Sequence, residues 1–202
     1  MKIICIGRNY IDHAKELNNP VPKSPLVFMK PSTALLLENK PFYYPEFTSD
    51  LHYELEVVLK ICKNGRHVQP QFASDYYEEI GLGIDFTARD IQRKCKEKGH
   101  PWEKAKGFDH SAVLSPFFKK EGYDMESIKF QMKKNGELVQ NGDTADLIFK
   151  FDYLIEYVSQ YFKLQIGDLI YTGTPAGVGP VKIGDQLEGF LEGNKILDCL
   201  IK

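Results

Sequence analysis

The sequence contains few cysteines, no long apolar run and no block of charge of one sign. Its four cysteines, at positions 5, 62, 95 and 199, stand far apart and form no CxxC pair. This spacing argues against a structural zinc site and against a disulfide framework, so we expect reduced, mostly buried thiols. No apolar run approaches the ~18 residues that a membrane span requires, so we expect no membrane partner.

Signals for export and for nucleic-acid or nucleotide binding are also missing. The first ten residues, MKIICIGRNY, hold an apolar stretch too short for a signal peptide, so we expect a cytoplasmic protein. The formal net charge is −2, and the most basic stretch, RDIQRKCKEK, still carries Asp90 and Glu97. Such a stretch is typical of a solvated helix face, and we expect no nucleic-acid partner. Neither GxGxxG after the first predicted strand nor GxxxxGK(S/T) occurs, which excludes the simplest nucleotide sites.

Three stretches predict helices, at residues 9–18, 87–99 and 152–162. Asn9 is placed to cap the first helix, and Gly99 is placed to end the second. In the third stretch the apolar residues recur at helical rather than alternating positions.

Short apolar runs bounded by turn residues predict strands over most of the remaining chain. We expect tight turns or hairpins at Asn64–Gly65, Asn135–Gly136 and Gly193–Asn194. No internal repeat and no change of composition marks a linker. Residues 1–202 are therefore predicted to form a single α+β domain with an antiparallel or mixed sheet.

Residues 51–60, LHYELEVVLK, place Glu54 and Glu56 within an otherwise apolar strand. Residues two apart in a strand point to the same side, so both carboxylates lie opposite Leu55 and Val57. At ~6 Å and an effective dielectric of ~20 they repel by roughly 3 kcal/mol. A half-buried pair therefore needs a proton, a basic partner or a cation. The alternative is an edge strand on which both acids face water.

A third acid, Asp85, ends the glycine-bearing strand pattern GLGID just before a predicted helix. Acids at the end of a strand commonly present a ligand group, although Asp85 could instead cap the helix. Three carboxylates without a nearby cysteine or a suitably spaced histidine pair favour a hard cation. Mg²⁺ or Mn²⁺ fits this donor set, with Ca²⁺ as an alternative.

Five stretches, taken in this order, resemble the fumarylacetoacetate hydrolase family: GRNYIDHAKEL, FMKPSTAL, HYELEVVL, IDFTARDIQRKCKEKGHPWEKAKGFD and GDLIYTGTPAGVGPV. The resemblance covers roughly residues 4–190 and is closest to short, single-domain members, the acylpyruvate hydrolase and oxaloacetate decarboxylase type. It implies a mixed β-sandwich roll with a few short helices, in which the helix at about 9–18 acts as a lid. It also implies a homodimer.

By this resemblance a divalent cation binds to Glu54, Glu56 and Asp85, the acids that strand geometry already selects. Lys106, in EKAKGFD, corresponds to a family lysine that reaches the metal site and the oxygens of the substrate. Taken alone, Lys106 is typical of the surface. Close to a bound substrate, its positive charge would stabilise a developing enolate.

The resemblance also implies substrate contacts. Arg89 and Gln92 are three residues apart and therefore share a helix face. Thr174, in YTGTP, corresponds to the residue that binds the substrate carboxylate. In the same loop we expect the Thr172 hydroxyl and the Gly173 backbone to be free for an anion, unless this is an ordinary strand-ending turn.

His13 and Glu16 are three residues apart on the first predicted helix. The simplest interpretation is a solvent-exposed pair worth only ~0.3 kcal/mol. The resemblance instead implies a general base, because short family members use this pair to activate water.

These residues together predict a metal-dependent hydrolase that cleaves the C–C bond of acylpyruvates or similar 2,4-diketo acids and releases pyruvate. Oxaloacetate decarboxylation and isomerisation of a 2-hydroxymuconate-type diacid are alternatives at the same site. A non-catalytic, metal-stabilised binding protein is a further alternative. The intact set of His13, Glu16, Lys106 and the three acids argues against it.

Overall fold

The computed structural model describes residues 1–16 and 20–202, and a large mixed sheet forms its centre. Within the described residues this sheet has eight strands: β2 (Leu26–Lys30), β1 (Ile3–Gly7), β12 (Leu169–Tyr171), β5 (Leu55–Ile61), β6 (Tyr77–Asp85), β8 (Ala112–Leu114) and β3 (Leu35–Leu36) in this order, with β9 (Phe118–Lys119) beside β6. The β1–β12 and β3–β8 pairs are parallel and the other pairs are antiparallel. The predicted α+β class with a mixed sheet is confirmed.

Two further sheets and several helices complete the fold. The second sheet contains β11 (Glu137–Asp143), β10 (Lys129–Lys134), β14 (Gln186–Leu191) and β15 (Asn194–Leu200). The small sheet contains β13 (Gly179–Pro180), β4 (Leu51–Tyr53) and β7 (Thr87–Ala88). The α-helices are α1 (Ile11–Glu16), α2 (Arg89–Lys98), α3 (Glu103–Lys106) and α4 (Phe151–Tyr161). Short 3₁₀ helices cover Ser32–Ala34, Pro70–Tyr76, Lys120–Gly122 and Thr144–Asp146.

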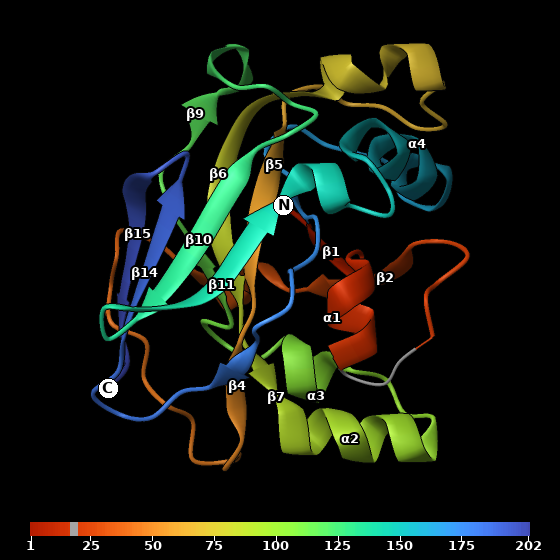
Figure 1. Ribbon diagram of the computed structural model, residues 1–202. Helices are drawn as coiled ribbons and strands as arrows, with labels where there is room; N and C mark the ends of the chain where they lie inside the picture. The colour runs from red at the N-terminus through yellow and green to blue at the C-terminus, as the bar shows by residue number, and fades with distance from the viewer. Residues whose placement is uncertain (17–19) are drawn as a thin grey trace.

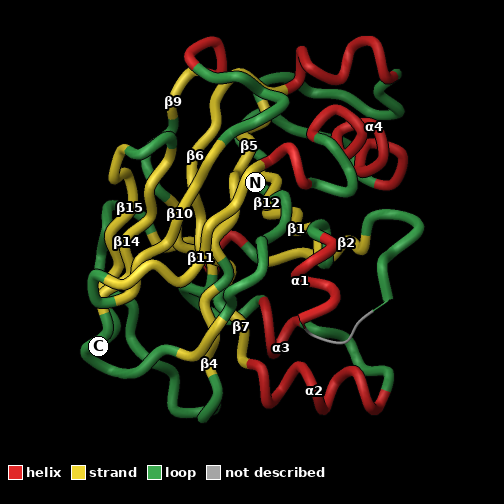
Figure 2. The backbone as a smooth tube through the Cα atoms, viewed as in Figure 1, coloured by secondary structure: helices red, strands yellow, loops and turns green. Residues whose placement is uncertain are grey.

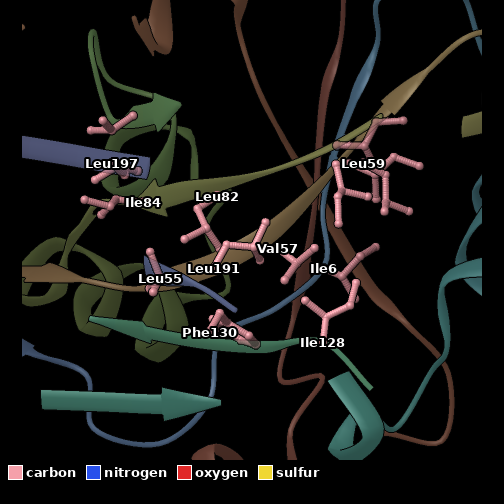
Figure 3. Packing of buried hydrophobic residues seen from close by; sticks show 14 of the residues in the cluster. Ile6, Leu55, Val57, Leu59, Leu82, Ile84, Ile128, Phe130, Leu191 and Leu197 are labelled. Atoms are coloured by element: carbon pink, nitrogen blue, oxygen red, sulfur yellow. The ribbon is translucent and has the colours of Figure 1, made fainter. Parts of the chain in front are cut away.

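The main hydrophobic core lies between the large sheet and the four-stranded sheet, and alternation along β5 decides what enters it. Leu55, Val57 and Leu59 are fully buried members of this core. Figure 3 shows them beside Leu82, Ile84, Phe130 and Leu191. Val58 belongs instead to a smaller apolar cluster on the opposite face of the sheet. Glu56 shares the side of Val58, away from the main core.

Helices α1, α2 and α3 gather beside the small sheet, whereas α4 lies apart from them (Figure 1). The tube view also shows that most of the strands lie on one side of the molecule and that α1, α2 and α3 lie on the other (Figure 2). Helix α2 contacts β4, and α3 contacts both β7 and β2. The helices thus lie where β5 begins and β6 ends. None of the described helices is long and apolar enough to cross a membrane.

Several predicted boundaries are confirmed. Helix α2 ends at Gly99, whose φ of +64° is left-handed and whose N–H reaches the carbonyls of Cys95 and Lys96. The hairpin between β10 and β11 turns at Asn135 and Gly136, where φ is +53° and +85°. Helix α4 begins one residue before the predicted stretch and ends one residue before its end.

Other predictions need correction. The helix predicted at 9–18 spans Ile11–Glu16 in the described residues, and positions 17–19 lie outside them. The terminal hairpin turns at Glu192 and Gly193, one residue earlier than predicted. Asn64–Gly65 forms no tight hairpin, because the connection from β5 to β6 contains the 3₁₀ helix Pro70–Tyr76. Helix α3 was not predicted.

Asn9 does not cap the first helix but ties three segments of the chain together. Its side-chain amide donates to the carbonyls of Phe149 and Thr172 at 3.0 and 2.8 Å. Its side-chain oxygen accepts from the Phe149 N–H at 2.8 Å. Asn9 is fully buried, and its bond to Thr172 is buried as well, whereas its two bonds to Phe149 are partly buried.

Replacing Asn9 by alanine should therefore lower the free energy of unfolding by about 3 kcal/mol. Each lost bond contributes ~1 kcal/mol, and its partners would be left buried without a replacement. Urea unfolding measures the change. Asn141→Ala is the matched control, because that side chain is exposed and bonds only to Gln131. A loss for Asn9→Ala no larger than that of the control would contradict this role.

Candidate active site

Three acids from neighbouring strands form a buried cluster. Glu54 lies between β4 and β5, Glu56 lies within β5, and Asp85 ends β6. Each is at most 5% exposed, and one oxygen of each lies within 4.8 Å of the other two. Strand β5 is paired on both sides, by β12 and β6, so the edge-strand alternative is wrong. The predicted clustering of these three acids is confirmed.

Two cations from the helices contact this cluster. Lys106 Nζ, from α3, lies 2.8 Å from Glu54 Oε2 and 2.6 Å from Asp85 Oδ2. Arg89 Nη2, from the start of α2, lies 2.5 Å from Glu54 Oε1. Lys106 is only 3% exposed, so the surface position typical of an isolated lysine is wrong here. The sequence-predicted Lys106 and Arg89 thus meet at Glu54.

A third cation, Lys30 of β2, was missed by the sequence analysis. Its Nζ lies 2.7 Å from Asp85 Oδ1, and the side chain is fully buried. The same ammonium donates to both the carbonyl and the hydroxyl of Ser111 and to the backbone carbonyl of Lys106. Lys30 therefore fixes the end of α3 as well as Asp85. The only signal in the sequence is a lysine that directly follows the apolar run LVFM.

The two glutamates of the cluster have opposite protonation preferences. Burial raises the pKa of Glu54, but the positive charges of Lys106 and Arg89 outweigh it and hold this pKa well below its usual value. Burial and the negative charges of Asp85 and Glu54 raise the pKa of Glu56 well above its usual value. The Gly173 N–H donates to Glu56 Oε2 at 2.7 Å. Of these two glutamates, Glu56 is therefore the one whose protonated form the surroundings favour when no metal is bound.

The donor set fits a divalent cation. Asp85 Oδ1 is buried without an aligned hydrogen bond, although Lys30 Nζ lies 2.7 Å from it. Among the described residues, Glu56 forms no ion pair with Lys, Arg or His. Carboxylate oxygens that lack donors are the ligands that Mg²⁺ and Mn²⁺ prefer. A bound cation would replace the proton on Glu56.

A histidine and a glutamine lie beside these charges. Arg89 Nη1 donates to Gln92 Oε1 at 2.9 Å, so these two side chains share a face as predicted. His13 is only 4% exposed, and its Nδ1 lies 3.4 Å from Glu16 Oε2. The interpretation of a solvent-exposed pair is therefore wrong for His13. Burial lowers the pKa of His13 although Glu54 and Glu16 raise it, so the imidazole is neutral near pH 7.

The loop after β12 differs in part from the prediction. The Thr172 hydroxyl donates to the Val57 carbonyl, and the Gly173 N–H is taken by Glu56. Neither group is free for an anion, so this expectation is wrong. Thr174 Oγ1 accepts from Gln140 Nε2 at 2.8 Å, which leaves its own proton free to donate. Gln140 was not predicted; its side-chain oxygen also accepts from the Leu55 N–H.

One small cavity connects most of the predicted residues. It has a volume of about 30 Å³, which is room for about one water molecule. The charged and polar residues at its wall are Arg8, His13, Glu54, Arg89, Gln92, Lys96 and Lys106. Leu26, Phe28 and Trp102 form the apolar part of the wall.

Residues 2–199 match the family model described as fumarylacetoacetate (FAA) hydrolase C-terminal. The chain belongs to the fumarylacetoacetate hydrolase family. It is 45% identical over 192 residues to the mitochondrial oxaloacetate tautomerase of Homo sapiens, covering 95% of this chain and 87% of that protein. It is 39% identical over 197 residues to an oxaloacetate tautomerase of Escherichia coli, and this match covers 96% of this chain and 90% of that protein.

A solved relative resembles the whole fold. It is a fumarylpyruvate hydrolase from Pseudomonas aeruginosa in complex with Mn²⁺ and pyruvate. Its TM-score is 0.94 at 33% identity, and the match covers 100% of this chain and 89% of that one. The expected family and its mixed, sheet-dominated fold are confirmed.

Replacing Glu56 by glutamine should change how stability depends on pH. In EDTA, the raised pKa of Glu56 means that the folded protein holds this proton more tightly than the unfolded chain does. The resulting stability is present below the usual pKa of 4.5 and is lost as pH rises through the folded pKa. We expect the free energy of unfolding to fall more in wild type than in Glu56→Gln between pH 5 and pH 8.

Urea unfolding at a series of pH values measures this difference. Saturating Mn²⁺ should restore stability at pH 8 in wild type, by ~2.7 kcal/mol at a hundred times the dissociation constant, but not in Glu56→Gln. Glu97→Gln, at an exposed position, is the control. Parallel pH curves for wild type and Glu56→Gln would show that Glu56 does not carry the proton.

Proposed function

We propose that the protein is a divalent-metal-dependent enzyme that interconverts the enol and keto forms of oxaloacetate. The observation that carries this proposal is the convergence of Lys106 and Arg89 on the carboxylate cluster beside a buried, neutral His13. The two oxaloacetate tautomerases at 45% and 39% identity support oxaloacetate as the substrate. The acylpyruvate hydrolysis expected from the sequence becomes the second candidate.

The substrate is held by charges that surround the cluster. Glu54, Glu56 and Asp85 would hold Mg²⁺ or Mn²⁺, with Ca²⁺ as the alternative, and the cation would act as a Lewis acid toward the oxygens of a 2-keto acid. Arg89 can bind a substrate carboxylate, because its buried Nε has no hydrogen-bond partner among the residues that the structure describes. Gln92 and Thr174 supply neutral contacts. Lys106 places a fixed positive charge where the enolate oxygen develops.

Tautomerisation requires one proton to move between C3 and the oxygen on C2. In the keto-to-enol direction, neutral His13 takes the C3 proton, and the C–H electron pair forms the C2–C3 double bond. The electrons of the carbonyl bond move to the C2 oxygen, which Lys106 stabilises. This oxygen then accepts the proton that the His13 imidazolium releases, so that His13 is neutral again. Glu16 beside Nδ1 orients the ring and stabilises the imidazolium. The reverse steps give the keto form.

The His13–Glu16 pair also supports the second candidate. In hydrolysis, His13 would remove a proton from a water molecule that attacks the distal carbonyl of an acylpyruvate. The C–C bond then breaks and leaves pyruvate enolate beside Lys106. In oxaloacetate decarboxylation, the loss of CO₂ would leave the same pyruvate enolate, and no attacking water would be needed. The 2-hydroxymuconate-type isomerisation would again use His13 for proton transfer.

A direct assay tests the proposal. Purified protein with Mg²⁺ or Mn²⁺ should accelerate the decay of enol-oxaloacetate, followed by its ultraviolet absorbance, and EDTA should abolish this acceleration. Pyruvate release from acetylpyruvate and from oxaloacetate, measured in parallel, reports hydrolysis and decarboxylation. No metal-dependent decay of the enol would reject the tautomerase. Pyruvate from acetylpyruvate alone would establish the hydrolase instead.

Replacing His13 by alanine should separate the reactions. Tautomerisation and hydrolysis should fall by about 10²–10⁴-fold, because both need a positioned base. Decarboxylation of oxaloacetate should survive, because it needs no base at this position. His100→Ala, at an exposed histidine, is the control. Unchanged tautomerisation and hydrolysis in His13→Ala would remove His13 from the mechanism.

The homodimer and the cytoplasmic location stay predictions. A row of packed tyrosine rings on α4, formed by Tyr153, Tyr157 and Tyr161, offers a surface for self-association. Tyr153 and Tyr161 are 41% and 59% exposed. The human relative carries the word mitochondrial in its name. The single domain over residues 1–202 also stays a prediction.

A further inference from the structure

Two cations at the wall of the cavity have no part in the mechanism described above. Arg8 follows β1, and Lys96 lies in the last turn of α2. Both line the cavity that contains Arg89, Gln92 and Lys106. Within the described part of the chain, neither forms an ion pair, unlike Lys106, Lys30 and Arg89. Among the described residues, the part of the wall that Arg8 and Lys96 form therefore carries positive charge without an ion-pair partner.

The charges of these two residues act on each other. Burial, followed by the positive charges of Arg8 and Arg89, lowers the pKa of Lys96 to about 8. Lys106 lowers this pKa slightly further, and only Glu54 raises it. The residue as a whole remains exposed, so only part of its side chain lies against the protein. Its Nζ lies 5.5 Å from the centre of the Trp102 ring. In a lysine that pointed freely into solvent, water and salt would screen these charges, and its pKa would not be lowered in this way.

The backbone at Arg8 is also unusual. Its φ is +59°, in the left-handed region that residues with a side chain rarely adopt. Such conformations occur disproportionately at ligand sites, where the surroundings fix them. Here the conformation accompanies a half-buried guanidinium whose pKa is lowered by burial. The described part of the chain therefore holds Arg8 at the cavity without an ion-pair partner.

We propose that Arg8 and Lys96 form an outer subsite that binds the second carboxylate of a dicarboxylic substrate. The inner end of the substrate would be its 2-keto acid group, at the cluster of Glu54, Glu56 and Asp85. This inference rests on the proposed function for the position of that inner end. It selects oxaloacetate, with a carboxylate at each end, over acetylpyruvate, which ends in a methyl group.

A pair of unreactive ligands tests the subsite without turnover. Malate has the four-carbon skeleton and both carboxylates of oxaloacetate, and 2-hydroxybutanoate has a methyl group in place of the outer carboxylate. Calorimetric titration of the Mn²⁺-loaded protein should give at least tenfold tighter binding of malate. Lys96→Met should weaken malate binding about tenfold and leave 2-hydroxybutanoate unchanged, because only malate loses a charge-assisted contact.

Matched variants separate charge from packing. Lys96→Arg should restore most of the malate affinity, and Arg8→Gln should weaken malate selectively, as Lys96→Met does. Lys94→Met, at an exposed position on the same helix, should change neither ligand. Equal weakening of both ligands by Lys96→Met would mean a packing role and would overturn the subsite. Malate that binds no tighter than 2-hydroxybutanoate to wild type, or not at all, would overturn it too.

Proton uptake gives a second readout. At pH 8 about half of Lys96 is uncharged, and a bound carboxylate would draw a proton onto it. Titrations in buffers of different ionisation enthalpy should therefore show uptake on binding of malate but not of 2-hydroxybutanoate, and Lys96→Met should abolish it. Failure of the oxaloacetate assay together with Lys96-dependent malate binding would reject the proposed function and retain the subsite. The opposite pattern would reject the subsite alone.

Discussion

Three carboxylates buried within 4.8 Å of one another repel strongly unless positive charge lies beside them, and much of this molecule is arranged to supply that charge. Lys106 neutralises both Glu54 and Asp85, and Arg89 neutralises Glu54 from the other side. Lys30 approaches Asp85 from the neighbouring strand β2. Among the described residues, Glu56 has no cationic side chain beside it, and a divalent cation bound here would supply the missing positive charge.

The same need explains the position of the short helices. Helices α2 and α3 carry Arg89 and Lys106 to the ends of β5 and β6, and Lys30 holds the carbonyl at the end of α3. On the other side, the β12 loop gives its Gly173 N–H to Glu56. A rigid sheet therefore fixes the acids while separate segments bring in the cations. Such a frame would suit tautomerisation, hydrolysis or decarboxylation, because each of these proposed reactions would pass through an enolate beside Lys106.

The sequence predicts those parts of the site that break a local rule. Glutamates at alternate positions of an apolar strand are anomalous by themselves, so Glu54 and Glu56 could be found without a structure. Lys30 and Gln140 could not, because their partners lie far away along the chain. The prediction that Asn9 caps the first helix failed for the same reason. Asn9 instead bonds to Phe149 and Thr172, which lie far away along the chain. Local propensity cannot register a tertiary contact.

A crystal of the protein grown with Mn²⁺ would show whether the acidic cluster is a metal centre. Anomalous scattering at the manganese edge would locate the ion without reference to activity. We expect one manganese per chain, bound by an oxygen from each of Glu54, Glu56 and Asp85. A cluster that stays free of manganese, with Lys106 still bridging Glu54 and Asp85, would contradict it.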